Sequence, residues 1–321
     1  MIKRLPLRFR PYLKKVIWGG NKICEFKRIP AEGPGIGESW EISAVPGYES
    51  VVVEGPYKGM NIVQLAEKYG SELLGKDVFD RYGARFPLLI KFIDAADNLS
   101  VQVHPDDALA MKRHNSMGKT EMWYIVQADN KARIYSGLNK TITPEEYEDR
   151  VKKGDFHTLV AEHDSKEGDV FFLPAGRVHA IGGGNLLAEI QESSDITYRI
   201  FDYNRRDKDG NLRELHTELA KDAIDFNFHK DYKSPPLPEN EPDFEIARCL
   251  HFNVRRLVIN DHFGLNLDNR SFTVLTCVKG NVKISYEDGE CSLSQGHSIL
   301  LPASMGDVEL SGKATLLVTR S

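Results

Sequence analysis

Two polar side chains on one short strand-like segment are the first residues in the sequence that could hold a metal ion. In SVQVHPDD (100–107), Gln102 and His104 stand two positions apart. Alternate residues of a strand face the same side, so both side chains point the same way, with Ser100 behind them. Pro105 then ends the strand, as at the rim of a barrel. A lone histidine on a strand is more often structural, so this pair needs partners from elsewhere in the chain.

A second segment supplies a carboxylate. In GKTEMWYIV (118–126), Lys119 and Glu121 share one face, while Met122 and the alternate apolar residues after it take the other. A carboxylate inside a barrel is costly unless it is paired or bound to a metal. Glu121 therefore predicts a polar partner in the interior. The sequence also allows a simpler interpretation, an ion pair between Glu121 and Lys119 at the surface.

His179 follows a spaced run of Gly and Pro. Gly168, Pro174, Gly176 and His179 have spacings of six, two and three residues. This pattern resembles the second motif of cupin barrels, in which a turn directs a histidine from the end of a strand into the barrel.

The same spacing returns near the end of the chain without the histidine. Gly296 and Pro302 are again six residues apart, but residues 305–307 are Met, Gly and Asp. We therefore expect two cupin units, of which only the first holds a metal.

Together these segments offer two imidazoles, one carboxylate and one amide. That donor set suits Zn²⁺ best, with Fe²⁺, Mn²⁺ or Co²⁺ acceptable by ligand type. Three firm ligands and a weak amide oxygen leave room for a substrate, which is typical of a catalytic site. We predict one Zn²⁺ per chain, with the ligands Gln102, His104, Glu121 and His179.

Longer fragments carry a resemblance to one family. The chain resembles type I phosphomannose isomerase, in its short bacterial form, through QVHPD (102–106), GKTEMWY (118–124), PAGRVHA (174–180), EIQESSDITYRIFDYNR (189–205), IWGG (17–20), GESWEIS (37–43), PLLIK (87–91) and RDKDGNLRELH (206–216). The resemblance implies the same four zinc ligands. It also implies a sugar-phosphate pocket formed by Trp18, Glu38, Lys91, Ser100, Lys119, Glu189, Asp195 and Arg199.

The implied reaction interconverts mannose 6-phosphate and fructose 6-phosphate by moving a proton between C1 and C2. A guanidinium keeps its proton, so Arg199 would stabilise charge or bind phosphate. Lys119 would act in ring opening or proton transfer. Glu189, Asp195 and a metal-bound water stay open as the base. Ser100 and Lys91, with Arg199 as competitor, are the expected phosphate donors.

Each pocket residue also has a structural interpretation. Lys91 could extend out of its strand, and Glu189 could lie on a solvated strand face. Asp195 could be a turn residue or could form a local ion pair with Arg199. Trp18 could be a core aromatic. Among the remaining histidines, His216 alone merits attention.

The elements that would position these groups are short strands with local helices. Val, Ile, Phe and Tyr are concentrated in 51–55, 87–95, 99–104, 121–128, 169–176 and 185–193, which predicts strands. Helical spacing appears in 61–75, 143–155 and 213–226. Thr143 and Pro144 have the order of a helix cap and first turn.

The expected fold is mainly β, with two cupin-like (jelly-roll) barrel units and short helical insertions. We place the catalytic unit at 1–228, a polar, Pro-rich linker at 229–245, and the metal-free unit at 246–321.

Composition limits the classes of function. The chain has 321 residues and a formal net charge of −5, so no basic excess favours nucleic acid. No apolar run reaches the roughly 18 residues of a membrane span. Four cysteines without CxxC spacing favour reduced thiols and a cytoplasmic location. The family resemblance implies a sugar phosphate as the partner, and nothing in the sequence predicts an obligate protein partner.

Two other functions remain possible from the sequence. The first is a metal-binding cupin that binds or senses a sugar without turnover, which would lack Lys119 or Arg199. The second is an iron-dependent cupin dioxygenase, which would carry a third histidine or a His-x-His pair where this chain has Gln102 and His104.

Overall fold

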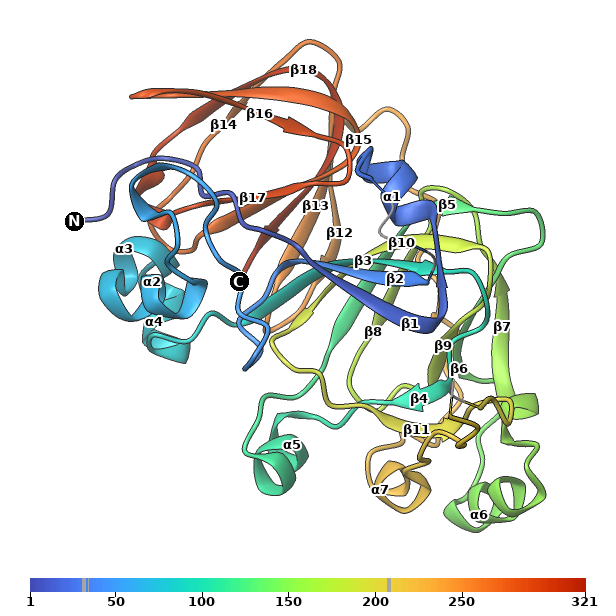
Figure 1. Cartoon of the computed structure of the whole chain (residues 1–321). Helices are drawn as coiled ribbons and strands as arrows, with labels where there is room; N and C mark the ends of the chain where they lie inside the picture. Colours follow the sequence, from blue (N-terminus) through green and yellow to red (C-terminus); the bar gives the residue numbers. More distant parts are fainter. Residues whose placement is uncertain (31–32, 34, 207–208) are drawn as a thin grey trace.

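The computed structural model describes residues 1–30, 33, 35–206 and 209–321 (Figure 1). Within these residues the chain is mainly β, and its strands pair antiparallel in three sheets. The predicted mainly β fold is confirmed. Of the fragment 206–216, Asp207 and Lys208 lie outside the described residues, as do residues 31, 32 and 34.

The first sheet forms one wall of the N-terminal part. Among the described residues its strand order is β1 (Tyr12–Gly20), β2 (Ile36–Ile42), β3 (Leu88–Ala95), β10 (Asn185–Glu192), β5 (Glu121–Ala128) and β8 (Val170–Leu173). The central strands β3 and β10 are buried along their whole length. Charged residues such as Lys91 and Glu189 interrupt the apolar residues of these two strands, so each strand carries buried polar groups as well as core residues.

The second sheet packs against the first. Among the described residues its order is β11 (Tyr198–Phe201), β4 (Val101–Val103), β9 (His179–Ile181), β6 (Arg133–Leu138) and β7 (Val160–Asp164). An apolar cluster that includes Ile93, Trp123 and Phe171 from the first sheet and Ile134 and Ile181 from the second fills the space between them.

The third sheet belongs to the C-terminal part, drawn in orange and red at the top of Figure 1. Among the described residues its order is β12 (Asp243–Arg248), β13 (Asn253–Ile259), β18 (Val308–Arg320), β15 (Thr273–Tyr286) and β16 (Gly289–Ser294), with β14 (His262–Leu265) on β18 and β17 (Ser298–Leu301) on β15. The chain start reaches this sheet, since Leu7 and Leu300 exchange backbone hydrogen bonds of 2.7 and 3.0 Å. One core cluster also joins residues of both predicted units.

The helices lie at the edges of the sheets. They are α1 (Lys22–Lys27), α2 (Ile62–Tyr69), α3 (Ser71–Leu74), α4 (Lys76–Tyr82), α5 (Asp107–His114), α6 (Pro144–Lys153) and α7 (Thr217–Lys221), and the 3-10 turns are Gly55–Tyr57, Phe156–Leu159 and Ala303–Met305. The predicted cap of α6 is confirmed, because Thr143 accepts the backbone N–H of Glu146 at 3.2 Å. None of the helices within the described ranges has the length and apolar character needed to cross a bilayer.

Three predicted elements differ from the structure. The helix expected at 61–75 is divided at Gly70, whose φ of 50° ends α2. Residues 51–55 form only isolated bridges before the turn at Gly55–Tyr57, so no extended strand forms there. The helix expected at 213–226 shortens to α7, because the backbone N–H of His216 donates to the carbonyl of Arg199 at 2.7 Å and the residues before it are not helical.

A close contact at Gly137 gives a test of the packing between β6 and the predicted linker. Gly137 has a φ of 77°, and a Cβ atom there would lie 2.0 Å from the ring of Tyr232. Tyr232 is buried and donates its hydroxyl to the carbonyl of Leu138 at 3.0 Å. Gly137→Ala is therefore expected to lower the free energy of unfolding by about 2–4 kcal/mol, from backbone strain and overpacking together.

The matched control is Gly154→Ala at the end of α6. Gly154 has a similar φ of 72°, but a Cβ atom added there would have no neighbour within 4 Å. Its cost should be about 1 kcal/mol, from placing an L-residue in the left-handed region alone. Urea unfolding of both variants measures the difference, and equal costs would contradict the packing argument.

Candidate active site

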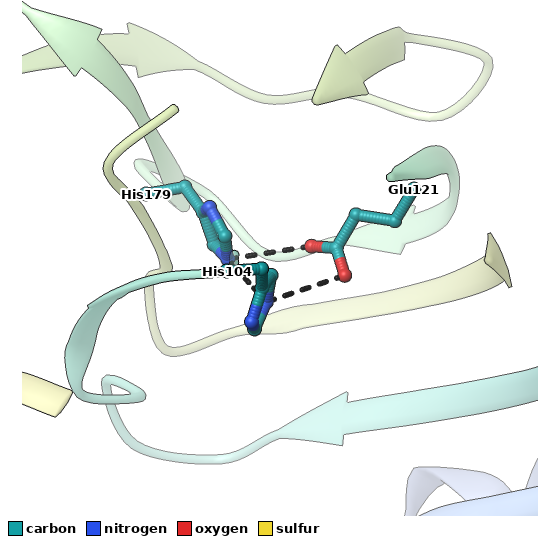
Figure 2. A group of neighbouring side chains, drawn as sticks. All are labelled: His104, Glu121 and His179. Atoms are coloured by element: carbon teal, nitrogen blue, oxygen red, sulfur yellow. Dashed lines mark hydrogen bonds and ion pairs between the residues drawn. The ribbon is translucent and has the colours of Figure 1, made fainter. Parts of the chain in front are cut away.

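Three side chains from three strands converge at one buried point (Figure 2). His104 follows β4, Glu121 begins β5 and His179 begins β9. The Nε2 atoms of the two histidines are 3.1 Å apart, and Glu121 oxygens lie 3.3 Å from His179 Nε2 and 3.4 Å from His104 Nε2. Ligands at about 2.0–2.1 Å in a regular tetrahedron lie about 3.3–3.4 Å from one another. These separations therefore match one face of such a tetrahedron.

The backbone fixes which nitrogen of each imidazole faces the cluster. His104 Nδ1 lies 2.9 Å from the carbonyl of Ile196, and His179 Nδ1 lies 2.8 Å from the carbonyl of Arg177. A ring that donates from Nδ1 presents a lone pair at Nε2, which is the usual arrangement of a metal-binding histidine. Burial, with Lys119 nearby, lowers the pKa of both rings. Two neutral Nε2 lone pairs thus face each other across the cluster.

Glu121 adds a buried charge to this cluster. Its side chain is 0% exposed, and its Oε1 has no hydrogen-bond partner. Burial and the charge of Glu189 raise the pKa of Glu121. A divalent cation would give this oxygen a partner and bind both imidazoles, so the donor set and the orphaned oxygen both fit a zinc ion.

Gln102 stands next to this cluster on β4. Its amide nitrogen lies 3.3 Å from His179 Nε2, and its oxygen accepts the hydroxyl of Ser100 at 3.3 Å. Turning the amide by half a turn exchanges its nitrogen and oxygen. The oxygen would then face the same point as the two imidazoles.

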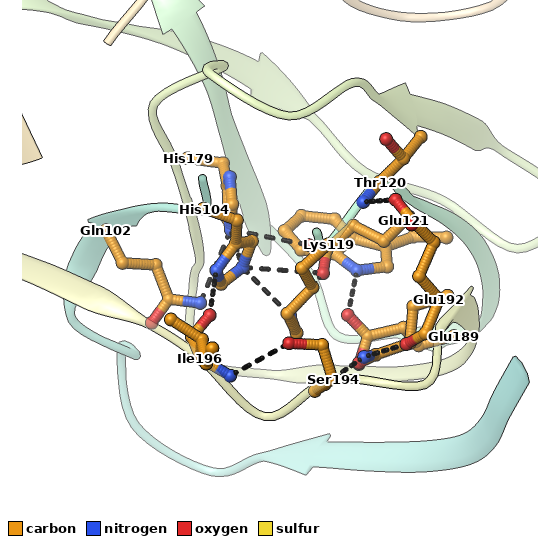
Figure 3. A network of polar contacts seen from close by, with 12 residues as sticks. Gln102, His104, Lys119, Thr120, Glu121, His179, Glu189, Glu192, Ser194 and Ile196 are labelled. Carbon is orange, nitrogen blue, oxygen red and sulfur yellow. Dashed lines mark hydrogen bonds and ion pairs between the residues drawn. The ribbon is translucent and has the colours of Figure 1, made fainter. Parts of the chain in front are cut away.

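Lys119 is part of the same network (Figure 3). Its ammonium lies 2.5 Å from Glu121 and 2.9 Å from His104 Nε2. The pair of Lys119 and Glu121 exists, but Lys119 is only 4% exposed. The interpretation of this pair as a surface ion pair is therefore wrong, because both partners are enclosed between the two sheets.

A second ion-pair network lies beside it. The ammonium of Lys91 is 2.6 Å from Glu189 and 3.6 Å from Glu38. Glu189 also accepts the indole N–H of Trp123 at 2.9 Å. Burial opposes ionisation of Glu189, but Lys91 and Lys119 outweigh it and hold the pKa of this carboxyl well below its usual range. Lys91 does not extend into solvent, and Glu189 is not on a solvated face.

These groups open into one cavity of about 320 Å³, a size typical of small-molecule sites. Nine of the twelve residues predicted for the site line it, namely Trp18, Glu38, Lys91, Ser100, Gln102, Lys119, Glu189, Asp195 and Arg199. The other three, His104, Glu121 and His179, lie buried beside Gln102 and Lys119. Trp18 is at once a core aromatic and a wall of the cavity.

Arg199 lies on β11 at one side of the cavity. Its guanidinium donates to the carbonyl of Glu214 at 2.7 Å, and its Nε is buried without a partner. Within the described part of the chain the Arg199 guanidinium donates to Glu214 and no ion pair joins it to Asp195, so the predicted alternative of a local ion pair is wrong. His216 contacts the backbone of Arg199, because the backbone N–H of Arg199 donates a hydrogen bond to His216 Nδ1 at 3.2 Å.

Several residues that line the cavity were not among those predicted from the sequence, and among them are five polar or aromatic groups that could contact a sugar. They are Lys14, Trp40, Trp123, Thr197 and Arg213. Trp123 follows Glu121 by two positions, so strand alternation could have identified it. Lys14 pairs with Glu38 across β1 and β2, a register that no local pattern reveals.

Two family models match this chain. Residues 7–162 match the model for the catalytic domain of type I phosphomannose isomerase, and residues 241–321 match the model for the cupin domain of mannose-6-phosphate isomerase.

Individual proteins are similar to this chain over nearly its full length. The chain is 34% identical to mannose-6-phosphate isomerase ManA of Bacillus subtilis, over 98% of each sequence. It is 33% identical to a mannose-6-phosphate isomerase of Streptococcus mutans, again over 98% of each. The crystal structure of a mannose 6-phosphate isomerase from Bacillus subtilis superposes with a TM-score of 0.89 at 33% identity, covering 98% of this chain and 99% of that one.

Proposed function

The chain belongs to the type I phosphomannose isomerase family, and from this premise we propose that it interconverts mannose 6-phosphate and fructose 6-phosphate with one bound zinc ion. The proposed zinc ligands are Gln102, His104, Glu121 and His179. The observation that carries the proposal is the convergence of two imidazole lone pairs and an unpaired carboxylate oxygen beside a polar cavity. When bound, the zinc would polarise sugar oxygens at its open position.

The residues around the cavity would divide the remaining tasks. Glu189 and Lys91 neutralise each other and form a fixed hydrogen-bonding pair for sugar hydroxyls. Because its pKa is held so low, Glu189 is a weak proton acceptor. Asp195 lies exposed in the loop between β10 and β11 and lines the cavity, so we assign to it the transfer of the proton between C1 and C2.

The cations would hold the charged parts of the substrate. Arg199 carries a permanent charge and has an unpartnered Nε, which suits it to a phosphate or to negative charge that develops during the reaction. Lys119 lies within reach of the metal ligands and lines the cavity, so it is placed to move a proton to or from a sugar oxygen during ring opening.

An assay with and without a chelator tests the proposal. The purified protein should convert mannose 6-phosphate to fructose 6-phosphate, lose this activity on exhaustive chelation and recover it when Zn²⁺ is restored, because Lys119 cannot replace the metal as the group that polarises sugar oxygens. Activity that survives complete removal of metal would contradict the zinc assignment. Binding of the sugar phosphate without turnover would instead favour a sugar-binding cupin.

A further inference from the structure

A second group of potential metal ligands lies apart from the cavity. Asp107 begins α5, Glu192 ends β10, and His251 lies in the loop between β12 and β13 of the C-terminal part. We call these three residues the rear cluster. His251 stands between the two acids, with Nδ1 3.3 Å from Glu192 and Nε2 4.0 Å from Asp107. None of the three lines the cavity described above.

Glu192 is the member that needs explanation. Its side chain is 1% exposed, and one oxygen accepts the backbone N–H of Thr120 at 2.7 Å (Figure 3). The other oxygen has no hydrogen-bond partner. Within the described ranges its only ion-pair partner is His251, whose pKa is lowered by burial, so that ring is neutral at pH 7. A buried carboxylate without a cation is costly.

Asp107 adds a second negative charge at the same place. Burial, together with the nearby charge of Asp107, raises the pKa of Glu192 to about 8. In the absence of a cation, Glu192 therefore keeps its proton at pH 7. A divalent cation bound between Asp107 and Glu192 would displace this proton and balance both carboxylates.

We propose that Asp107, Glu192 and His251 bind a second divalent transition metal ion, such as Zn²⁺ or Mn²⁺. One ligand atom from each residue lies within 4.8 Å of the others. Two carboxylate oxygens and one imidazole nitrogen are a donor set that both metals accept. The ligands must close by about 1 Å to reach bonding distances. Asp107 has a side chain that is 54% exposed, and its Oδ2 can turn toward His251 while its Oδ1 keeps the hydrogen bond to Gly118.

The position of the rear cluster gives the second metal a role. Asp107 accepts the backbone N–H of Gly118 at 2.7 Å, and Glu192 accepts that of Thr120. These two hydrogen bonds hold the segment that carries Lys119 and Glu121 into the active site. A metal at the rear cluster would tie this segment to the C-terminal part through His251.

Counting metal ions per chain tests the inference without any substrate, so its outcome is independent of the proposed isomerase activity. The full chain is stripped with a chelator, dialysed against Zn²⁺ or Mn²⁺ and analysed by atomic emission. The intact protein should hold two ions, Glu192→Gln one and Glu121→Gln one, and the double variant none. Glutamine keeps the oxygen that accepts from Thr120, so the fold should persist.

Two neighbouring acids provide the matched control. Asp107→Asn removes a proposed ligand and should lower the count by one. Asp106→Asn removes an equal charge one residue away, at the N-cap of α5, where asparagine caps equally well, and should leave the count at two.

One ion in the intact protein and still one in Glu192→Gln would overturn the inference, as would two ions in both. If Glu192→Gln does not fold, His251→Gln serves instead, because His251 is partly exposed. A count of two in a folded His251→Gln variant would likewise overturn it.

Discussion

Glu121→Gln is expected to remove the active-site metal and abolish isomerase activity while leaving the size of the side chain unchanged. Glu121 is the only anionic member of the proposed ligand set, and it lies within 3.4 Å of both histidine Nε2 atoms. Metal affinity should fall by more than the roughly 10–100-fold that loss of an outer partner costs. Turnover should fall at least about 10³-fold, because a metal contributes several kcal/mol to such reactions. Metal analysis and a coupled isomerase assay measure the two effects.

The control for this prediction is Glu162→Gln on β7. Glu162 is exposed and pairs with Arg133, so its variant should keep full metal content and activity. Circular dichroism would show that both variants are folded. If Glu121→Gln kept its metal, the buried carboxylate would have to be explained by Lys119 alone, and the proposed ligand set would fail.

Strand alternation was enough to predict much of this site from the sequence. It placed Gln102 with Ser100 and Lys119 with Glu121, and the structure brings both pairs to the cavity or to the buried cluster beside it. The reason is that a period of two is a property of the strand itself and needs no tertiary information. The same rule extended by one step would have added Trp123.

Contacts between distant strands could not be predicted in this way. Lys91 lies between Glu38 and Glu189 because β3 pairs with both β2 and β10. The register of those pairings depends on packing across the whole sheet. The sequence pattern therefore could not decide whether Lys91 lines the site or extends out of its strand. The rear cluster was even less predictable from the sequence, because Asp107 and Glu192 are 85 positions apart along the chain and Glu192 and His251 are 59 positions apart.

The segment after β11 was the least predictable part of the site. Its helical spacing predicted a helix over 213–226, but Glu214 and His216 form hydrogen bonds with Arg199, the helix begins only at Thr217, and Arg213 lines the cavity. Tertiary hydrogen bonds override a weak local preference in this segment.

Arg199→Ala is expected to leave the metal in place and to lower kcat/KM for mannose 6-phosphate by about 10²–10³-fold, the usual effect of removing one fixed electrostatic donor. None of the side-chain contacts described for Arg199 involves His104, Glu121 or His179, since its guanidinium donates to Glu214 instead. The metal count should therefore match that of the unchanged protein. Steady-state kinetics and metal analysis on the same preparation measure both quantities.

Arg206→Ala is the control, because Arg206 is exposed and hydrogen-bonded to Gly210 without lining the cavity. It removes the same charge from the same segment and should change kcat/KM little.

The role of Arg199 follows from whether the loss of kcat/KM in Arg199→Ala comes from KM or from kcat. A rise in KM alone means that Arg199 binds the phosphate equally in the ground and transition states, whereas a fall in kcat means that it stabilises charge formed during proton transfer. Loss of the metal from Arg199→Ala would contradict the separation between the residues that hold the metal and those that act on the sugar.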